Sequence, residues 1–171
     1  MLDEPLLGDC EVELVGFGDE EAARAFRHSS AHILGAAIEQ VYDEPQLTIG
    51  PPIQDGFYYD FFSPSGEVVR DAEDYKLVEK AMTKIVNQNH PFERLIISKE
   101  QALDLFAYNQ FKVELIEKKV ADAELTSVFR IGDFIDLCTG PHIPSTKYVR
   151  SFKILKHSQA YWLGDSSRPS L

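Results

Sequence analysis

Residues 27–35 read RHSSAHILG, and residues 136–142 read DLCTGPH. The first stretch spaces two histidines four positions apart, and an α-helix places such a pair on one face, about one turn apart. The second stretch places a cysteine four positions before a third histidine, around a Gly-Pro turn. Together the two stretches predict a small polar site where four side chains converge as metal ligands or as groups that position water. The four residues are His28, His32, Cys138 and His142.

The first stretch lies within a predicted helix of residues 20–42, with Asp19 as its N-cap. Apolar residues recur at helical spacing along one side of this segment, which indicates a buried face. Gly35 continues the stripe formed by the two histidines, and its lack of a side chain allows another group to approach closely. The remaining face should meet solvent, and it includes Arg24, Glu39 and Gln40.

Helical and strand-like segments mix along the chain without regular βαβ alternation, which predicts an α+β fold with an antiparallel or mixed sheet. Further helices are expected at 72–89, 99–107 and 109–119, strands at 11–15, 47–49, 57–62, 92–97, 124–130 and 134–137, and a terminal hairpin from 152–156 and 160–163. Residues 1–19 are assigned to an N-terminal extension or the end of a preceding module, and residues 20–171 to one domain.

The composition is that of a globular protein, with 44% hydrophobic and 26% charged residues. We find no basic-plus-apolar leader and no apolar run of about 20 residues, so neither secretion nor a membrane partner is expected. Two cysteines fit a reducing compartment.

The net charge of −11 argues against a general nucleic-acid binder. Residues 147–171, however, hold five Lys and Arg against one Asp, or 5 − 1 = +4, which leaves −11 − 4 = −15 for the preceding residues. This basic end fits a solvated face and local phosphate contact equally well.

Each candidate residue also has a purely structural interpretation. Ser29 follows His28 where a metalloprotease helix carries Glu, which argues against peptide hydrolysis. Cys138 could be a buried thiol, and its use as a covalent nucleophile ranks lower than a role in positioning water. Asp136, two positions before it, points to the same side of a strand. By default Lys112 and Tyr108 lie on a solvated face. Tyr58 and Tyr59 are expected in the core or in a pocket wall, and Trp162 is expected in the core.

Five motifs carry a resemblance to a known family: HSSAHILG at 28–35, IGPP at 49–52, DGFYYD at 55–60, DLCTGPH at 136–142 and YWLGD at 161–165. Over about residues 20–171, the chain resembles the editing domain of threonyl-tRNA synthetases of the bacterial and eukaryotic type, a domain related to that of alanyl-tRNA synthetases. The resemblance implies the editing-domain fold and the hydrolysis of serine wrongly esterified to tRNA(Thr).

The resemblance also implies a set of site residues. The imidazoles and Asp136 would orient a water molecule and accept its proton. Lys112 would stabilise the oxyanion or hold the terminal adenosine, and Tyr58 or Tyr59 would stack on that adenosine or bound it. The full implied set is His28, His32, Lys112, Asp136, Cys138 and His142 for catalysis, and Gly35, Tyr58, Tyr59 and Tyr108 for substrate contact.

No cofactor is expected to be required, because an ester needs less activation than an amide. Zinc held by the three histidines and Cys138 is the alternative, since alanyl relatives bind zinc through an equivalent set. The expected partners are the serine-bearing 3′ end of tRNA(Thr) and the remainder of a synthetase. The chain stops before any ATP-binding sheet, so an excised domain unable to form threonyl-adenylate is expected. A cytoplasmic location is expected, with an organellar copy also open, and a non-catalytic tRNA-binding or partner-binding module is a third possibility.

Overall fold

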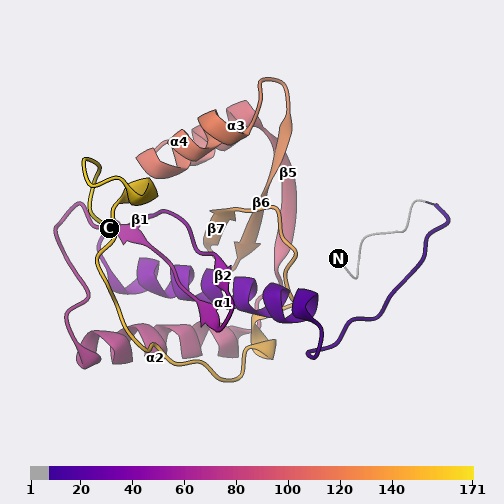
Figure 1. The fold of residues 1–171 in the computed structure, drawn as a ribbon, viewed down its shortest axis with the longest axis horizontal. Coiled ribbons are helices and arrows are strands. Elements are labelled where there is room, and N and C mark those ends of the chain that lie inside the picture. Colours follow the sequence, from indigo (N-terminus) through magenta and orange to yellow (C-terminus); the bar gives the residue numbers. More distant parts are fainter. Residues whose placement is uncertain (1–7) are drawn as a thin grey trace.

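The computed structural model describes residues 8–171, which form an α+β fold as predicted. Two long helices, α1 (Glu20–Val41) and α2 (Ala72–Gln88), lie side by side and form one layer (Figure 1). A small sheet and two shorter helices, α3 (Lys99–Leu105) and α4 (Gln110–Lys119), lie on the other side of α1 (Figure 1). The main core fills the space among α1, α2 and this sheet.

The long helices begin and end where local chemistry predicts. Asp71 caps α2 by accepting hydrogen bonds from the backbone of residues 73 and 74, and Asn89 ends the helix in the left-handed region at φ 53°. Asp19 stands at the N-cap of α1, but its carboxylate accepts from the backbone N–H of Gly16 and makes no cap bond to the helix. The inward face of α2 is apolar, with Val78, Met82 and Ile85 buried.

The three-stranded sheet is antiparallel, in the order β5 (Glu93–Ser98), β6 (Leu125–Ile131), β7 (Phe134–Leu137). Helices α3 and α4 connect β5 to β6 and enclose a second apolar cluster against these strands. Because β7 lies against α1, the chain that leaves the end of β7 emerges beside that helix. This placement sets the position of the candidate site.

The predicted strand at 57–62 is split in the structure. Its first part belongs to β3 (Gly56–Phe57), which pairs with β2 (Pro52–Ile53), and its last part forms β4 (Phe61–Phe62), which pairs with β1 (Gln46–Leu47). The two ends therefore hydrogen-bond to different partners, and residues 58–60 bridge them. Tyr59 lies in this bridge and is buried.

The predicted C-terminal hairpin is wrong. After β7 the chain passes a cis Gly140–Pro141 bond and the 3-10 turn η1 (Thr146–Tyr148), and then runs along α2 without strand pairing. Phe152 and Ile154, which lie in the expected first strand of the hairpin, pack against the α1–α2 core instead. A second turn, η2 (Trp162–Gly164), buries Trp162 as predicted. We call residues 146–157 the C-terminal strap.

The predicted N-terminal strand at 11–15 is also wrong. This segment leads away from the body (Figure 1), and Val12 and Leu14 are 66% and 94% exposed. Its alternating pattern has no neighbouring strand within residues 8–171 to pair with. Residues 1–7 of the assigned extension lie outside the described part of the chain. Across residues 8–171, no helix has the length and apolarity that a bilayer crossing requires.

Candidate functional site

The structure brings the two quoted stretches together. His28 and His32 project from α1, with ring centroids 5.2 Å apart, and Cys138 and His142 follow β7. One potential ligand atom from each of the four lies within 4.8 Å of all the others. Cys138 Sγ lies 3.3 Å from His28 Nε2 and 3.2 Å from His142 Nε2. The two segments thus converge, as predicted from the two stretches taken together.

Aromatic side chains hold the His142 ring in place. Phe92 stacks on it at 4.8 Å with an interplanar angle of 13°, and Phe129 contacts it edge-on at 4.4 Å. These contacts remove the imidazole from water, so burial lowers the pKa of His142 far below its usual value. Burial also lowers the pKa of His28, and that of His32 to about 4. All three imidazoles are therefore neutral near pH 7 and able to accept a proton or bind a metal.

Ser29 orients His142, a role that was not predicted from the sequence although Ser29 lies within residues 27–35. Its hydroxyl donates to the carbonyl of Ala25 at 2.7 Å and accepts from the backbone N–H of Ile143 at 3.0 Å. His142 Nδ1 lies 3.1 Å from the same oxygen. Because the only hydroxyl proton goes to Ala25, Nδ1 must be the donor here, which leaves a lone pair on Nε2 facing Cys138.

A buried charged network lies next to the histidines. Asp136 accepts hydrogen bonds from Tyr59 and from Lys112, both at 2.5 Å, and lies 3.5 Å from His32 Nε2. Burial raises the pKa of Asp136, but the combined effect of Lys112, His32 and Tyr59 outweighs burial and lowers that pKa below its usual value. The carboxylate favours the His32 tautomer with its proton on Nε2. His32 Nδ1 then carries a lone pair, and this buried atom has no partner within residues 8–171.

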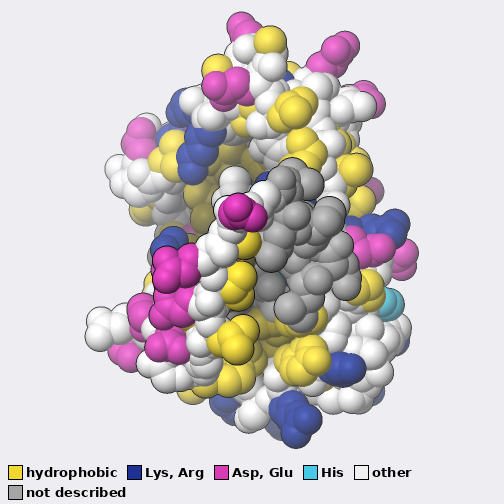
Figure 2. Space-filling model, turned by 90° about the vertical axis from the view of Figure 1, so that its right-hand side faces the viewer, with side chains coloured by type: hydrophobic (Ala, Val, Ile, Leu, Met, Phe, Trp, Pro, Cys, Tyr) yellow, Lys and Arg dark blue, Asp and Glu magenta, His cyan; other side chains and the backbone are white. Residues whose placement is uncertain are grey.

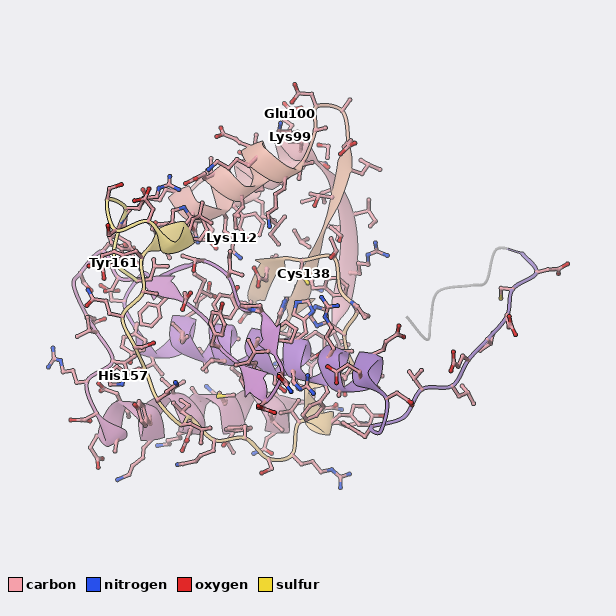
Figure 3. All side chains as sticks on the ribbon, in the orientation of Figure 1. Lys99, Glu100, Lys112, Cys138, His157 and Tyr161 are labelled. Atoms are coloured by element: carbon pink, nitrogen blue, oxygen red, sulfur yellow. The ribbon has the colours of Figure 1, made fainter. Side chains whose placement is uncertain are left out.

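Lys112 is only 4% exposed, which corrects the default expectation of a solvated lysine. It projects from α4 toward β7, on the side where Cys138 lies (Figure 3). Its Nζ donates to Asp136 and, at 3.4 Å, to the hydroxyl of Tyr59. An ammonium has three N–H donors, so one is left for a bound group.

The four candidate substrate-contacting residues occupy different environments. Tyr59 is buried, and a Cβ placed on Gly35 would lie 2.8 Å from its ring, so the absent Gly35 side chain makes room for Tyr59. Its hydroxyl is engaged with Asp136, and we therefore assign Tyr59 to positioning this carboxylate rather than to stacking on a base. Tyr58 and Tyr108 are 42% and 60% exposed and have ring surface available for a ligand.

Glu39 departs from its predicted solvent-facing position, because it is half-buried one turn beyond Gly35 on the stripe of α1 that carries the histidines. Burial, and then the nearby Asp136, raise the pKa of Glu39 to about 7. Its place on this stripe follows from helical spacing, but its burial depends on how the rest of the chain folds around α1.

The thiol of Cys138 is poorly suited to serve as an unassisted nucleophile. Burial raises its pKa to about 12, although the N–H of Gly140 donates to the sulfur at 3.2 Å. The neutral thiol instead donates to one of the two facing imidazoles. This arrangement favours a role for Cys138 in positioning water over a role as a covalent nucleophile.

The donor set also fits zinc. Tetrahedral zinc at about 2.0–2.3 Å from its ligands needs donors about 3.5 Å apart, and the two S–N distances of 3.3 and 3.2 Å are close to that spacing. The unpartnered Nδ1 of His32 supplies a further lone pair. The four residues could therefore hold zinc after small side-chain movements.

Comparisons with known proteins indicate the family to which the chain belongs. A sequence profile described as "Threonyl and Alanyl tRNA synthetase second additional domain" matches residues 126–171. The chain is 44% identical over 170 residues to a probable cytoplasmic threonine–tRNA ligase of Dictyostelium discoideum, covering 99% of this chain and 23% of that protein. It is 46% identical over 172 residues to a mitochondrial threonine–tRNA ligase of Arabidopsis thaliana, covering 99% and 24%.

A threonine–tRNA ligase of Thermotoga petrophila is 44% identical over 172 residues, covering 99% of this chain and 26% of that protein. The chain thus spans about a quarter of the length of these curated relatives. Their names include cytoplasmic and mitochondrial proteins, so the similarity fits either compartment.

Proposed function

Because the chain is a domain of the threonyl-tRNA synthetase type, we propose that it hydrolyses the ester of serine wrongly attached to tRNA(Thr). The observation that carries this proposal is the cluster of three neutral imidazoles and a thiol beside the buried Lys112–Asp136 pair. Such a cluster can bind a water molecule, take its proton and stabilise the resulting charge.

Simple energetics explain the need for such a site. Serine lacks one methyl group of threonine, and a binding pocket can penalise that loss by only about 1–3 kcal/mol. A second site that admits serine and excludes the larger threonine adds the missing discrimination. In this proposal the partners are the 3′ end of tRNA(Thr) and the remainder of a synthetase, neither of which contributes residues to the four-residue cluster.

The proposed reaction needs no metal. A water oxygen attacks the ester carbonyl while an imidazole Nε2, that of His28 or His142, accepts the water proton. Asp136 lowers the cost of the positive charge that develops on the imidazoles, and the free N–H of Lys112 stabilises the oxyanion. The carbon–oxygen bond to the ribose then breaks, and the imidazolium returns its proton to the ribose oxygen. The products are serine and tRNA with a free terminal hydroxyl.

Zinc hydrolysis is the second candidate, favoured by the convergence of four donors and by the unpartnered His32 Nδ1. His28, His32, Cys138 and His142 would hold the ion, which would supply an acidified water when bound. Elemental analysis of the purified protein separates the candidates. Stoichiometric zinc, with loss of the circular-dichroism spectrum on chelation, supports zinc. Hydrolysis unaffected by a chelator supports the metal-free reaction.

The decisive experiment compares hydrolysis of seryl-tRNA(Thr) and threonyl-tRNA(Thr) by the same preparation. We expect rapid loss of serine and slow loss of threonine. His28→Ala and His32→Ala should each lower the seryl rate about 100-fold or more, because each removes an imidazole from the cluster. His90→Ala is the matched control, since His90 contacts Gln88 away from the cluster. Full activity in both site variants would refute the assignment, and tRNA binding without turnover would support the non-catalytic module.

A further inference from the structure

The C-terminal strap runs antiparallel to α2 and is fixed to it at three points. Thr146 Oγ1 donates to the carbonyl of Ile85 at 3.1 Å, near the end of α2. The backbone N–H of Ile154 donates to Glu79 at 2.9 Å. His157, at the far end, lies 2.7 Å from the hydroxyl of Tyr75 (Figure 3). The strap and the outer side of α2 therefore form one continuous surface.

This surface is strongly basic in an acidic chain. Residues 75–90 and 146–157 contain seven Lys and Arg and one Glu, a balance of 7 − 1 = +6. The rest of the chain therefore carries −11 − 6 = −17. Figure 2 shows Lys and Arg side chains at the lower end of the molecule, the end where Figure 1 places α2 and η1. Mutual repulsion at such a surface favours an anionic partner.

Most of these cations are free to meet a ligand. Lys76 pairs with Glu73, and Lys153 pairs with Glu79. The other five are exposed and form no ion pair with any residue in 8–171. On α2 the lysines recur every four residues, which places them in one stripe, and Tyr148 on the strap is 49% exposed beside the ammonium of Lys147. We call these five residues the basic face: Lys80, Lys84, Lys147, Arg150 and Lys156.

We propose that the basic face binds the phosphate backbone of a tRNA acceptor stem. This proposal rests on the function proposed above. The strap begins four residues after His142, so at most about 18 Å of extended chain separates Lys147 from the cluster. A duplex held on the basic face can therefore extend its unpaired 3′ end to the site. The contacts are with phosphates and are independent of base sequence. The acidic remainder of the surface repels the duplex elsewhere and so limits its orientation.

The test measures binding of uncharged tRNA(Thr) by the whole chain across a salt series. We expect Lys80→Gln/Lys84→Gln and Arg150→Gln/Lys156→Gln each to weaken binding about tenfold at low salt. Each should reduce the slope of log affinity against log salt by about 1–2, because phosphate contacts release condensed counterions. Another tRNA should show the same losses. The control Lys118→Gln/Lys119→Gln removes two charges at the end of α4, away from the basic face, and should change neither quantity.

A seryl ester on a short single-stranded oligonucleotide ending in CCA separates this proposal from the proposed function. We expect the variants to hydrolyse this short ester at the wild-type rate while acting more slowly on seryl-tRNA(Thr). If the variants hydrolyse the short ester and their tRNA binding is unchanged, the docking proposal is overturned. An acidic protein would then be the better candidate partner for the basic face. Absence of tRNA binding by the wild type at low salt would also overturn it. If tRNA binding depends on the basic face but neither ester is hydrolysed, only the proposed function is refuted.

Discussion

Lys112 illustrates what the identity of a single residue can and cannot predict. Its polar type favours solvent, yet the structure buries it against Asp136, a residue 24 positions away. No local pattern encodes that pairing, and the family resemblance was what indicated a site role for Lys112. The histidines differ in this respect, because helical spacing alone places His28 and His32 on one face. Spacing therefore predicts which neighbours share an element, and it leaves contacts between elements open.

The raised pKa of the single residue Glu39 predicts that the free energy of unfolding depends on pH. Its pKa in the folded chain is about 7, against 4.5 for the free side chain. As pH rises from about 4.5 to 7 the unfolded chain releases this proton first, so the free energy of unfolding falls over that interval. Glu39→Gln should therefore be more stable than the wild type at pH 8, by up to about 3 kcal/mol, and nearly equal to it at pH 4. Urea unfolding at both values measures this difference.

Glu117→Gln is the matched control for Glu39, because Glu117 is an exposed carboxylate on α4. It should change the free energy of unfolding by less than about 0.5 kcal/mol at either pH. Equal stability of the Glu39 variant and the wild type at pH 8 would contradict the burial of a charged carboxylate at this position.

At the scale of elements, strong local signals predicted structure well. Helix α1 was expected at 20–42 and runs from Glu20 to Val41, and α3, expected at 99–107, begins at Lys99 with a Ser98 capping box. The failures involve alternating segments. Phe152 and Ile154 alternate like a strand, but their apolar side chains pack on the α1–α2 core while the backbone of Ile154 bonds to Glu79. Alternation shows which side chains turn inward, and it does not show whether a partner strand exists.

Helix α4 supplies a prediction about capping. Asn109 is 1% exposed, accepts hydrogen bonds from the backbone of Phe111 and Lys112, and donates to the carbonyl of Leu47 at 2.8 Å. Asn109→Ala should lower the free energy of unfolding by about 2–4 kcal/mol, because it removes the cap and leaves a buried carbonyl without its donor. Ser98→Ala, which removes an exposed cap, should cost about 1 kcal/mol. Similar losses in denaturant titrations of the two variants would argue against the link from α4 to β1.

At the scale of the whole molecule, Glu114 on α4 anchors the C-terminal end of the chain. This carboxylate accepts two hydrogen bonds from Arg168, at 2.8 and 2.9 Å, and one from Trp162 Nε1 at 2.9 Å. Arg168, followed by Lys118 and Trp162, lowers the pKa of Glu114 to about 2. These contacts fix the chain after the strap onto α4 and keep the single tryptophan buried.

Lowering the pH should therefore detach the chain after the strap from α4. A lowered carboxylate pKa contributes stability above the unfolded value of 4.5, and that contribution is lost as pH falls toward 2. The fluorescence of Trp162 should shift to longer wavelength over this interval. In Glu114→Gln it should already be shifted at pH 7 and change less with acid. Asp122→Asn, which breaks an exposed pair with Lys99, should titrate like the wild type. Identical fluorescence titrations for Glu114→Gln and the wild type would show that the Glu114 contacts do not keep Trp162 buried.

The contact between His28 and Cys138 joins positions 110 residues apart in the chain. On a translating ribosome the helix bearing the first two rings is complete long before the loop that opposes it has been synthesised. The four-residue cluster therefore cannot form in a growing chain until position 142 has left the exit tunnel, and a chain terminated anywhere upstream would lack the activity proposed above.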